Sequence, residues 1–223
     1  MMPLIALVIF IILAVGWWFY VCVVECSSER KGERGESILT LALGDLDPKL
    51  YHVMNDVLLP DGFPSGQGTT QIDHIVFSPF GIFVVETKNY SGWIFGNPKS
   101  AKWCQCFYGK RFYFQNPYRQ NYKHVCCLSQ LTGLNKDAFI QVIAFVGPCT
   151  VKTRDVLPPS FVVSQAELET FIHSHRIPRI SDALLLQAEN AIRKAQIENT
   201  PDAKENHISR VRGKCYNYVE SRY

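Results

Sequence analysis

The first hydrophobic feature of the chain is an uncharged stretch that runs from Leu4 to Val24. A helix of about 20 residues rises roughly 30 Å, which matches the hydrocarbon thickness of a bilayer. Trp17 and Trp18 stand near its end, where aromatic side chains favour the membrane interface. The pattern predicts a single-pass transmembrane helix as an anchor over residues 1–25.

Positive charge follows this segment and does not precede it. Arg30, Lys31 and Arg34 come directly after the apolar stretch. Because positive residues favour the inner side of a membrane, we expect a protein of the cell membrane whose C-terminal domain is cytoplasmic. A cleaved signal peptide is the alternative, but the segment lacks a preceding Lys or Arg, exceeds the usual apolar length and has no small-residue cleavage site.

After a charged linker over residues 26–34, the chain changes to short periodic segments. Residues 36–43 place apolar side chains at helical spacing and are followed by Gly44, which predicts a helix whose apolar stripe holds Ile38, Leu41 and Ala42, widened by Leu39 and Leu43. Residues 51–59 predict a first strand. Residues 60–68 contain two Pro and three Gly, which predicts a loop.

Residues 70–78 and 81–89 are two further apolar runs separated by a turn. Ser78, Pro79 and Gly81 occupy the positions that these residues prefer in a type I turn, so the runs should form an antiparallel hairpin. A four-residue SPFG loop would pair Phe77 with Ile82 and Ile75 with Val84, and would bring Asp73 opposite Glu86. A three-residue loop with a bulge at Gly81 would shift this register by one residue.

The remaining segments complete an α/β pattern. Residues 91–115 hold short aromatic runs broken by Gly and Pro, typical of additional short strands. Residues 116–134 predict a helix capped by Asn116, ended by Gly133 and carrying an apolar stripe of Tyr118, Tyr122, Val125, Leu128 and Leu131. Residues 140–147 predict a central strand. The order helix, three strands, helix, strand favours a meander followed by a crossover.

The C-terminal part is expected to be a mainly helical extension over residues 150–223. It contains a possible strand near residues 161–164 and two helical patterns over residues 166–175 and 181–196. The whole chain has 223 residues and a net charge of +3, which is far weaker than the clustered basicity of a dedicated DNA-binding module. Its eight cysteines form no paired CxxC motif, which favours free thiols over a zinc site.

Asp73 and Glu86 are the candidate chemistry of the hairpin. Directly opposed strand residues have Cβ atoms about 5 Å apart, so two carboxylates there repel each other unless a proton or a cation lies between them. Lys88 follows Glu86 on the same face by strand alternation. The alternative is a solvated face on which Lys88 is a salt-bridge partner, but the apolar neighbours on this face favour burial, which makes an uncompensated pair costly.

The joint order of QIDHI, GIFVVETKNY, GWI and NPYRQN resembles the nuclease-related domain, abbreviated NERD, of the PD-(D/E)xK nuclease-like superfamily. The resemblance covers roughly residues 31–149. It implies a restriction-endonuclease-like αβββαβ core with a mixed central sheet. The residue before Asp73 is Ile72, so the literal Pro-Asp of the superfamily name is absent.

The resemblance also implies roles for single residues. Asp73 and Glu86 match the metal-binding carboxylates, with the Thr87 backbone carbonyl as a further ligand, and Lys88 matches the lysine that orients or activates the attacking water. Glu36 matches an acidic position that completes the site, and Gln120 matches a polar position that faces it. The implied cofactor is Mg²⁺ or Mn²⁺, because hard oxygen ligands suit these ions.

Several other residues have two readings. His74 should lie opposite Asp73 as a packed residue, while His124, one turn after Gln120, should support the site. Trp93 and Trp103 could stack on bases or pack in the core. The basic residues that could follow a phosphate backbone, or form a solvated face, are Lys110, Arg111, Arg119 and Lys123.

The function that follows is a membrane-anchored, metal-dependent nuclease that hydrolyses phosphodiester bonds in DNA. The alternative is a catalytically inactive nucleic-acid-binding or protein-interaction module at the membrane. A complete Asp, Glu and Lys set favours the enzyme.

Overall fold

The computed structural model describes residues 13, 15, 16, 30–61 and 68–220, with side chains as far as Arg210. The predicted anchor over residues 1–25 therefore lies, apart from three residues, outside the described part. Among the helices of the described part, none is both long and apolar enough to cross a membrane. Residues 30–44 are helical, so the last five residues of the predicted linker belong to the first helix.

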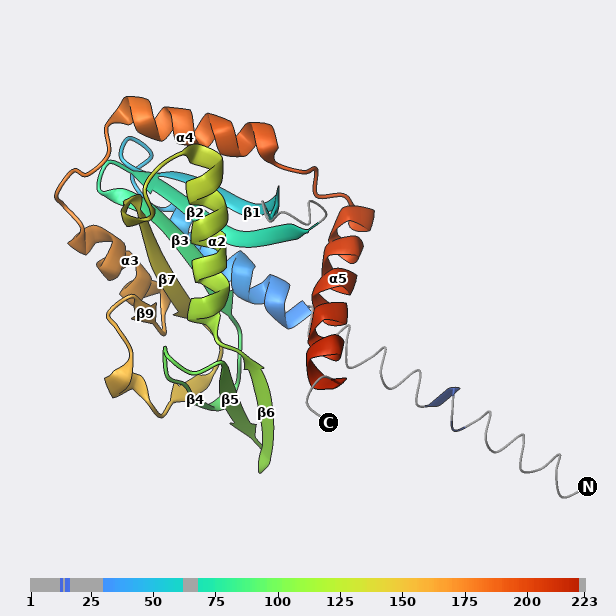
Figure 1. The fold of residues 1–223 in the computed structure, drawn as a ribbon. Helices are drawn as coiled ribbons and strands as arrows, with labels where there is room; N and C mark the ends of the chain where they lie inside the picture. The colour runs from blue at the N-terminus through green and yellow to red at the C-terminus, as the bar shows by residue number, and fades with distance from the viewer. Residues whose placement is uncertain (1–12, 14, 17–29, 62–67, 221–223) are drawn as a thin grey trace, which may run out of the picture.

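A mixed five-stranded sheet forms the centre of the protein (Figure 1). Its order is β1 (His52–Pro60), β2 (Thr69–Ser78), β3 (Gly81–Lys88), β7 (Phe139–Phe145) and β9 (Phe161–Val162). The pairs β1–β2 and β2–β3 are antiparallel, whereas β3–β7 and β7–β9 are parallel. The predicted meander and crossover are thus confirmed, and β9 shows that the C-terminal part adds a strand to the same sheet.

Helices cover both faces of this sheet. Leu39 and Leu43 of the first helix pack with Leu168 and Ile172 of α3 (Gln165–Ser174) against one face. On the other face, residues of α2 (Pro117–Thr132) and α4 (Asp182–Ala195) share a core cluster with the hairpin strands. α5 (Pro201–Glu220) lies beside the first helix (Figure 1). Two short 3-10 helices, η1 (Lys136–Ala138) and η2 (Arg154–Val156), complete the connections.

A second sheet follows directly from β3. It has the order β6 (Lys110–Gln115), β5 (Lys102–Phe107), β4 (Gly92–Phe95) and β8 (Cys149–Val151). Its three strands between β3 and α2 confirm the short aromatic strands that the sequence predicts. Trp103 is buried at its base and stacks on Phe145 of β7, with ring centroids 6.0 Å apart. This packing joins the second sheet to the central one.

The hairpin of β2 and β3 has the register that a four-residue SPFG turn predicts. Phe77 pairs with Ile82, Ile75 with Val84, and Ser78 closes the ladder with Gly81. Gly81 has a φ of 147°, and a Cβ at this position would lie 2.5 Å from the Ile140 side chain. Because both the backbone and the space favour glycine, the turn is fixed and the shifted register does not form.

Two predicted helix faces are wrong in part. In the first helix Leu41 is 75% exposed and Ile38 is 37% exposed, while Leu39, Ala42 and Leu43 are buried. In α2 the predicted stripe residue Tyr122 is 50% exposed. The buried face of α2 instead includes Asn121, whose amide donates to the carbonyls of Val84 and Val142 at 2.8 and 3.0 Å. A polar side chain with backbone partners can face the core, which an apolar pattern does not reveal.

Candidate active site

The candidate site lies where β2 and β3 stop pairing. Their ladder runs from Ser78 and Gly81 to His74 and Val85, and Asp73 and Glu86 come next in the same register. Here Asp73 Oδ2 accepts a hydrogen bond from the Thr87 N–H at 2.6 Å. A carboxylate therefore takes a backbone donor of β3 just beyond the paired residues, which holds Asp73 against that strand.

Strict alternation of faces is interrupted beside Asp73. Ile72 and Ile75 are three residues apart and yet belong to the same core cluster, as do Met54 and Val57 on β1. On β1 the interruption coincides with Asp56, which has a φ of 53°. Beside this interruption, the Asp73 carboxylate lies against the Thr87 N–H of β3.

Glu86 is buried, and both of its carboxylate oxygens have partners. Lys88 Nζ donates to Oε1 at 2.6 Å, and His124 Nε2 lies 3.1 Å from Oε2. Because an ionised carboxylate can only accept, His124 Nε2 carries the hydrogen. The other ring nitrogen, Nδ1, lies 2.8 Å from the hydroxyl of Thr70. α2 and β2 thus fix the position of Glu86 through a chain of polar contacts.

Lys88 connects this carboxylate to the predicted residue of α2. Its Nζ donates to Gln120 Oε1 at 3.2 Å, and its side chain is 20% exposed while that of Glu86 is 1% exposed. The structure therefore brings Glu86, Lys88 and Gln120 together at the end of β3. Among Glu86, Lys88 and His124, the side chain of Lys88 is the most exposed, while its ammonium is held by Glu86 and Gln120.

The pKa values of the Asp73 and Glu86 carboxyl groups shift in opposite directions. Burial raises the pKa of Asp73 well above its usual range, and the negative charges of Glu86 and Glu36 raise it further. Burial acts in the same direction on Glu86, but the charge of Lys88 and the hydrogen bond from His124 outweigh it, so the pKa of Glu86 is lowered. Glu86 has its compensating cation in the chain, whereas the negative charge at Asp73 is only partly compensated.

Lys88 remains a cation in this setting. Burial acts to lower its pKa, but the carboxylates of Glu86 and Asp73 outweigh this and raise the pKa above its ordinary value. A protonated amine can donate hydrogen bonds and offset negative charge, but it cannot accept a proton. The arrangement favours a role for Lys88 in positioning or charge stabilisation.

Glu36 lies on the first helix and faces the site from the side. It is half-buried, and burial followed by the charge of Asp56 raises its pKa, with a smaller effect from Glu86. Glu36 and Lys204 line a cavity of about 810 Å³ between the first helix and α5. The charge of Glu36 thus acts on Asp73, and the charge of Glu86 acts on Glu36.

The oxygen atoms of the candidate site are possible ligands of a divalent cation. Within the part of the chain that the structure describes, no three His, Cys, Asp or Glu side chains form a cluster able to hold a metal ion. Two carboxylates and a carbonyl nevertheless suit Mg²⁺, which uses few protein ligands and keeps several waters. The N–H and the carbonyl of one strand residue point to the same side of the strand. The Thr87 N–H donates to Asp73, so the Thr87 carbonyl points toward Asp73 as well, whereas the Lys88 carbonyl points the other way and accepts from the N–H of Val146.

Sequence reasoning missed three residues around the site. Thr70 anchors His124, and Asp56 binds Gln71 at 2.6 Å and pairs with Lys204 of α5. Asp56 is level with Asp73 in the sheet, since its neighbours Asn55 and Val57 pair with His74 and Ile72. The β1–β2 register is the signal that could have located Asp56 beside Asp73. Lys204 is 148 residues away from Asp56 in sequence, and no local pattern indicates their contact.

Comparisons with known proteins identify the family of the chain. The family model of the nuclease-related domain matches residues 31–146, which include every residue of the candidate site between Glu36 and Gln120. An uncharacterized protein of Bacillus anthracis is 35% identical over 185 residues, which cover 82% of this chain and 85% of that protein. No solved structure is significantly similar to the chain. The chain therefore belongs to the nuclease-related domain family of the PD-(D/E)xK-like nuclease superfamily.

Proposed function

We propose that the protein is a metal-dependent nuclease that hydrolyses phosphodiester bonds in DNA. The observation that carries this proposal is the Lys88 ammonium, held by Glu86 and Gln120 next to a carboxyl group at Asp73 whose negative charge lacks full compensation. A cation site beside a fixed ammonium is suited to a phosphate group with an attacking water. Membership of a nuclease-related family supports the same reaction.

The residues that would hold Mg²⁺ or Mn²⁺ are Asp73, Glu86 and the Thr87 carbonyl. When bound, the ion lowers the pKa of a coordinated water and offsets the charge on the phosphate. Hydrolysis joins the water oxygen to phosphorus and breaks the bond from phosphorus to the leaving ester oxygen, which takes up a proton. The pKa of Asp73, raised in the ion-free protein, is expected to fall when a cation is close.

Lys88 is assigned the positioning of the water and the phosphate oxygens. Its raised pKa keeps it protonated, so it donates hydrogen bonds and does not act as the base. Gln120 and Glu86 fix the ammonium from two directions at 3.2 and 2.6 Å. His124 and Thr70 then act through Glu86 by fixing the carboxylate, which makes them positioning residues.

The proposed location is the cell membrane, with the nuclease-related domain on the cytoplasmic side. The uncharged stretch from Leu4 to Val24 and the basic residues that follow it support this part of the proposal. A single-pass anchor would hold the site near the membrane surface, where the DNA must reach it.

A second candidate function is binding without cleavage. It is favoured by the partners of Glu86, since both carboxylate oxygens are already engaged by Lys88 and His124. Such a closed ion network could serve to stabilise the fold of a nucleic-acid-binding or protein-interaction module. The two candidates differ in whether Asp73 and Lys88 affect turnover.

The test is a cleavage assay on the full chain in detergent micelles, with labelled DNA and Mg²⁺ or Mn²⁺. Asp73→Asn and Lys88→Ala should each lower the rate by about 100-fold or more, the size of effect seen when one transition-state contact is removed. Lys194→Ala, on the exposed surface of α4, is the matched control and should cleave at the parent rate. Equal residual activity in all four proteins would indicate contamination and reject the catalytic proposal, and DNA binding without cleavage would support the second candidate.

A further inference from the structure

The second sheet exposes large aromatic side chains on its outer face. Trp93 and Phe95 of β4 are 55% and 39% exposed, and Tyr113 of β6 is 65% exposed. The opposite face of this sheet carries Ile94 and Trp103, which are buried against Phe145 and Phe161. The outer rings are therefore presented by a backbone that is fixed from behind, and their exposure is a property of the folded sheet.

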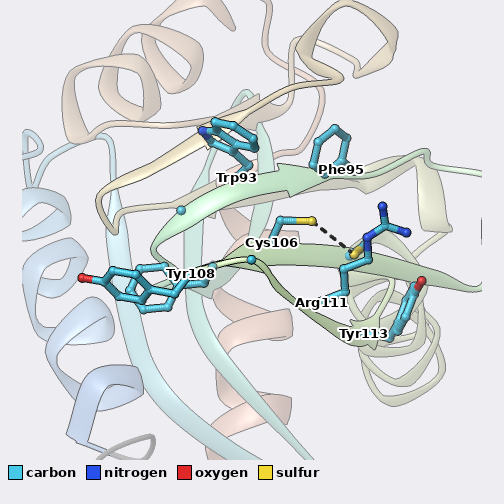
Figure 2. A pocket seen from close by; sticks show the side chains of 10 residues that line it. Trp93, Phe95, Cys106, Tyr108, Arg111 and Tyr113 are labelled. Carbon is cyan, nitrogen blue, oxygen red and sulfur yellow. Dashed lines mark hydrogen bonds between the residues drawn. The ribbon is translucent and has the colours of Figure 1, made fainter.

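The pairing of the three strands makes this face a groove. Trp93 pairs with Cys106, which pairs with Arg111, and Phe95 pairs with Cys104, which pairs with Tyr113. Each row places a small cysteine on the central strand between two large side chains on the outer strands. Figure 2 shows Cys106 lying between Trp93 and Arg111. The resulting hollow has a volume of about 690 Å³, with a cysteine floor and aromatic and basic walls.

The width of the groove selects a flat and narrow ligand. Neighbouring strands lie about 4.8 Å apart, so β4 and β6 are separated by about 10 Å. A B-DNA duplex is wider than its own major groove, which is already about 12 Å across, so a double helix is too wide to enter. An unpaired base has a planar face that stacks on Trp93 or Tyr113 regardless of its identity.

The charge around the groove favours a polyanion. From Thr87 to Lys136 the chain contains eight Lys and Arg residues and no Asp or Glu, although the whole chain has 23 basic and 20 acidic residues. Arg111 is exposed on one wall, and Lys152 Nζ lies 4.7 Å from the centroid of the Trp93 ring on the other. Desolvation and the neighbouring Cys106 raise the pKa of the Cys104 thiol on the floor, which favours the neutral form of that thiol.

The groove lies at the same end of the central sheet as Lys88. β3 ends at Lys88 and β4 begins at Gly92, while β7, parallel to β3, leads from Phe145 to β8 of the second sheet. Figure 1 shows β4, β5 and β6 extending from the end of α2 at which that helix begins. Gln120, which contacts Lys88, lies in the first turns of the same helix. The groove and the candidate site therefore lie at the same end of the central sheet.

We propose that the outer face of the second sheet binds single-stranded DNA, with bases stacked on Trp93 and Tyr113 and phosphates on Arg111 and Lys152. The proposal deepens the proposed function and rests on it for the identity of the substrate, since it makes an unpaired strand the form that reaches Lys88. A membrane surface is the competing partner for exposed aromatic and basic residues. The groove shape favours DNA, because a concave hollow does not match the flat surface of a bilayer.

The test measures binding in EDTA, where cleavage does not contribute. The full chain in detergent micelles is titrated into a fluorescein-labelled 20-nucleotide oligo(dT) and into a duplex of the same length. Trp93→Ala combined with Tyr113→Ala should weaken single-strand binding at least tenfold, and the parent should bind the single strand more tightly than the duplex. Tyr122→Ala, a tyrosine of α2 that is 50% exposed, is the matched control and should bind as the parent does.

Two further measurements keep the outcome decisive. Trp93→Phe as a single variant retains a stacking ring and should bind oligo(dT) within about threefold of the parent affinity, which a folding defect would not allow. Unchanged oligo(dT) affinity in the double variant would overturn the proposal. If that variant also bound phosphatidylglycerol vesicles less tightly than the parent, the outer face would be a membrane contact. If the parent binds oligo(dT) through the groove but never cleaves it, the groove stands and the nuclease assignment fails.

Discussion

The central sheet and the second sheet depart from the usual distribution of side chains in opposite ways. In the central sheet, Glu86 is a charged group inside the fold, with His124 of α2 as a buried partner, while in the second sheet Trp93 and Tyr113 are large rings in contact with solvent. Charged side chains are seldom buried without partners, and an exposed group of large apolar side chains indicates an interaction surface. The buried charges are compensated by one another, and the exposed rings have basic neighbours. Both features lie at the end of β3, which suggests that one ligand explains them together.

The largest expected effect separates the two faces of the second sheet. Trp103→Ala should lower the free energy of unfolding by about 3–5 kcal/mol, because it removes a fully buried ring that packs on Phe145 and Phe161. Trp93→Ala should cost less than about 1 kcal/mol, since that ring is half exposed. Urea denaturation of both variants measures the difference. Similar losses would show that the outer ring is part of the core.

A smaller effect is expected from breaking the buried charge network. Glu86→Ala should lower the free energy of unfolding by about 3 kcal/mol, because it leaves Lys88 and His124 without their shared carboxylate. Glu33→Ala, an exposed carboxylate of the first helix, should change it by less than about 0.5 kcal/mol. Equal urea midpoints for Glu86→Ala and Glu33→Ala would contradict a stabilising role of the buried charge network.

The pH dependence should distinguish Asp73 from Glu86. An acid with a raised folded pKa contributes fully to stability below its unfolded pKa, near 3.9, and this contribution is lost as the pH rises through the folded pKa. Asp73→Asn should therefore be more stable relative to the parent at pH 8 than at pH 5, in unfolding experiments without divalent cations. Mg²⁺ should stabilise the parent at pH 8 more than the variant, and an identical pH profile of both proteins would contradict the electrostatic assignment.

The smallest effect concerns the charge of the groove. Arg111→Gln should reduce the slope of log affinity against log salt for oligo(dT) by about 0.7, the contribution of one phosphate contact to a single strand. Lys194→Gln, on the exposed surface of α4, should leave the slope unchanged. Equal slopes for Arg111→Gln and the parent would remove Arg111 from the phosphate path.

Sequence patterns predicted the parts of the fold that depend on local chemistry. The SPFG turn determines the hairpin register, and Asn116, Pro117 and Gly133 mark the ends of α2. The positions of the site residues at the end of β3 follow from that register. Strand alternation failed at Asp73, because the positive φ of Asp56 on the neighbouring strand interrupts it, and no local pattern at Asp73 shows this.

Other features depend on partners that are distant in sequence. Asn121 and His124 are buried because strand carbonyls and Glu86 meet their polar atoms, so an apolar stripe could not identify the inner face of α2. The second sheet is completed by β8, which pairs with β4 across more than 50 residues of chain. Trp103 is buried and Trp93 is exposed because one face of this sheet packs on Phe145 and Phe161, which are also distant in sequence.

The most direct test of the account is the steady-state cleavage of single-stranded DNA with Mg²⁺ by the full chain and two variants. Lys88→Ala should lower kcat by about 100-fold with little change in KM, because its contact acts on the reacting phosphate. Trp93→Ala combined with Tyr113→Ala should raise KM about tenfold or more with kcat nearly unchanged, because stacking contributes equally to substrate and transition state. Parallel losses of kcat in both variants, or cleavage that neither variant changes, would contradict the account.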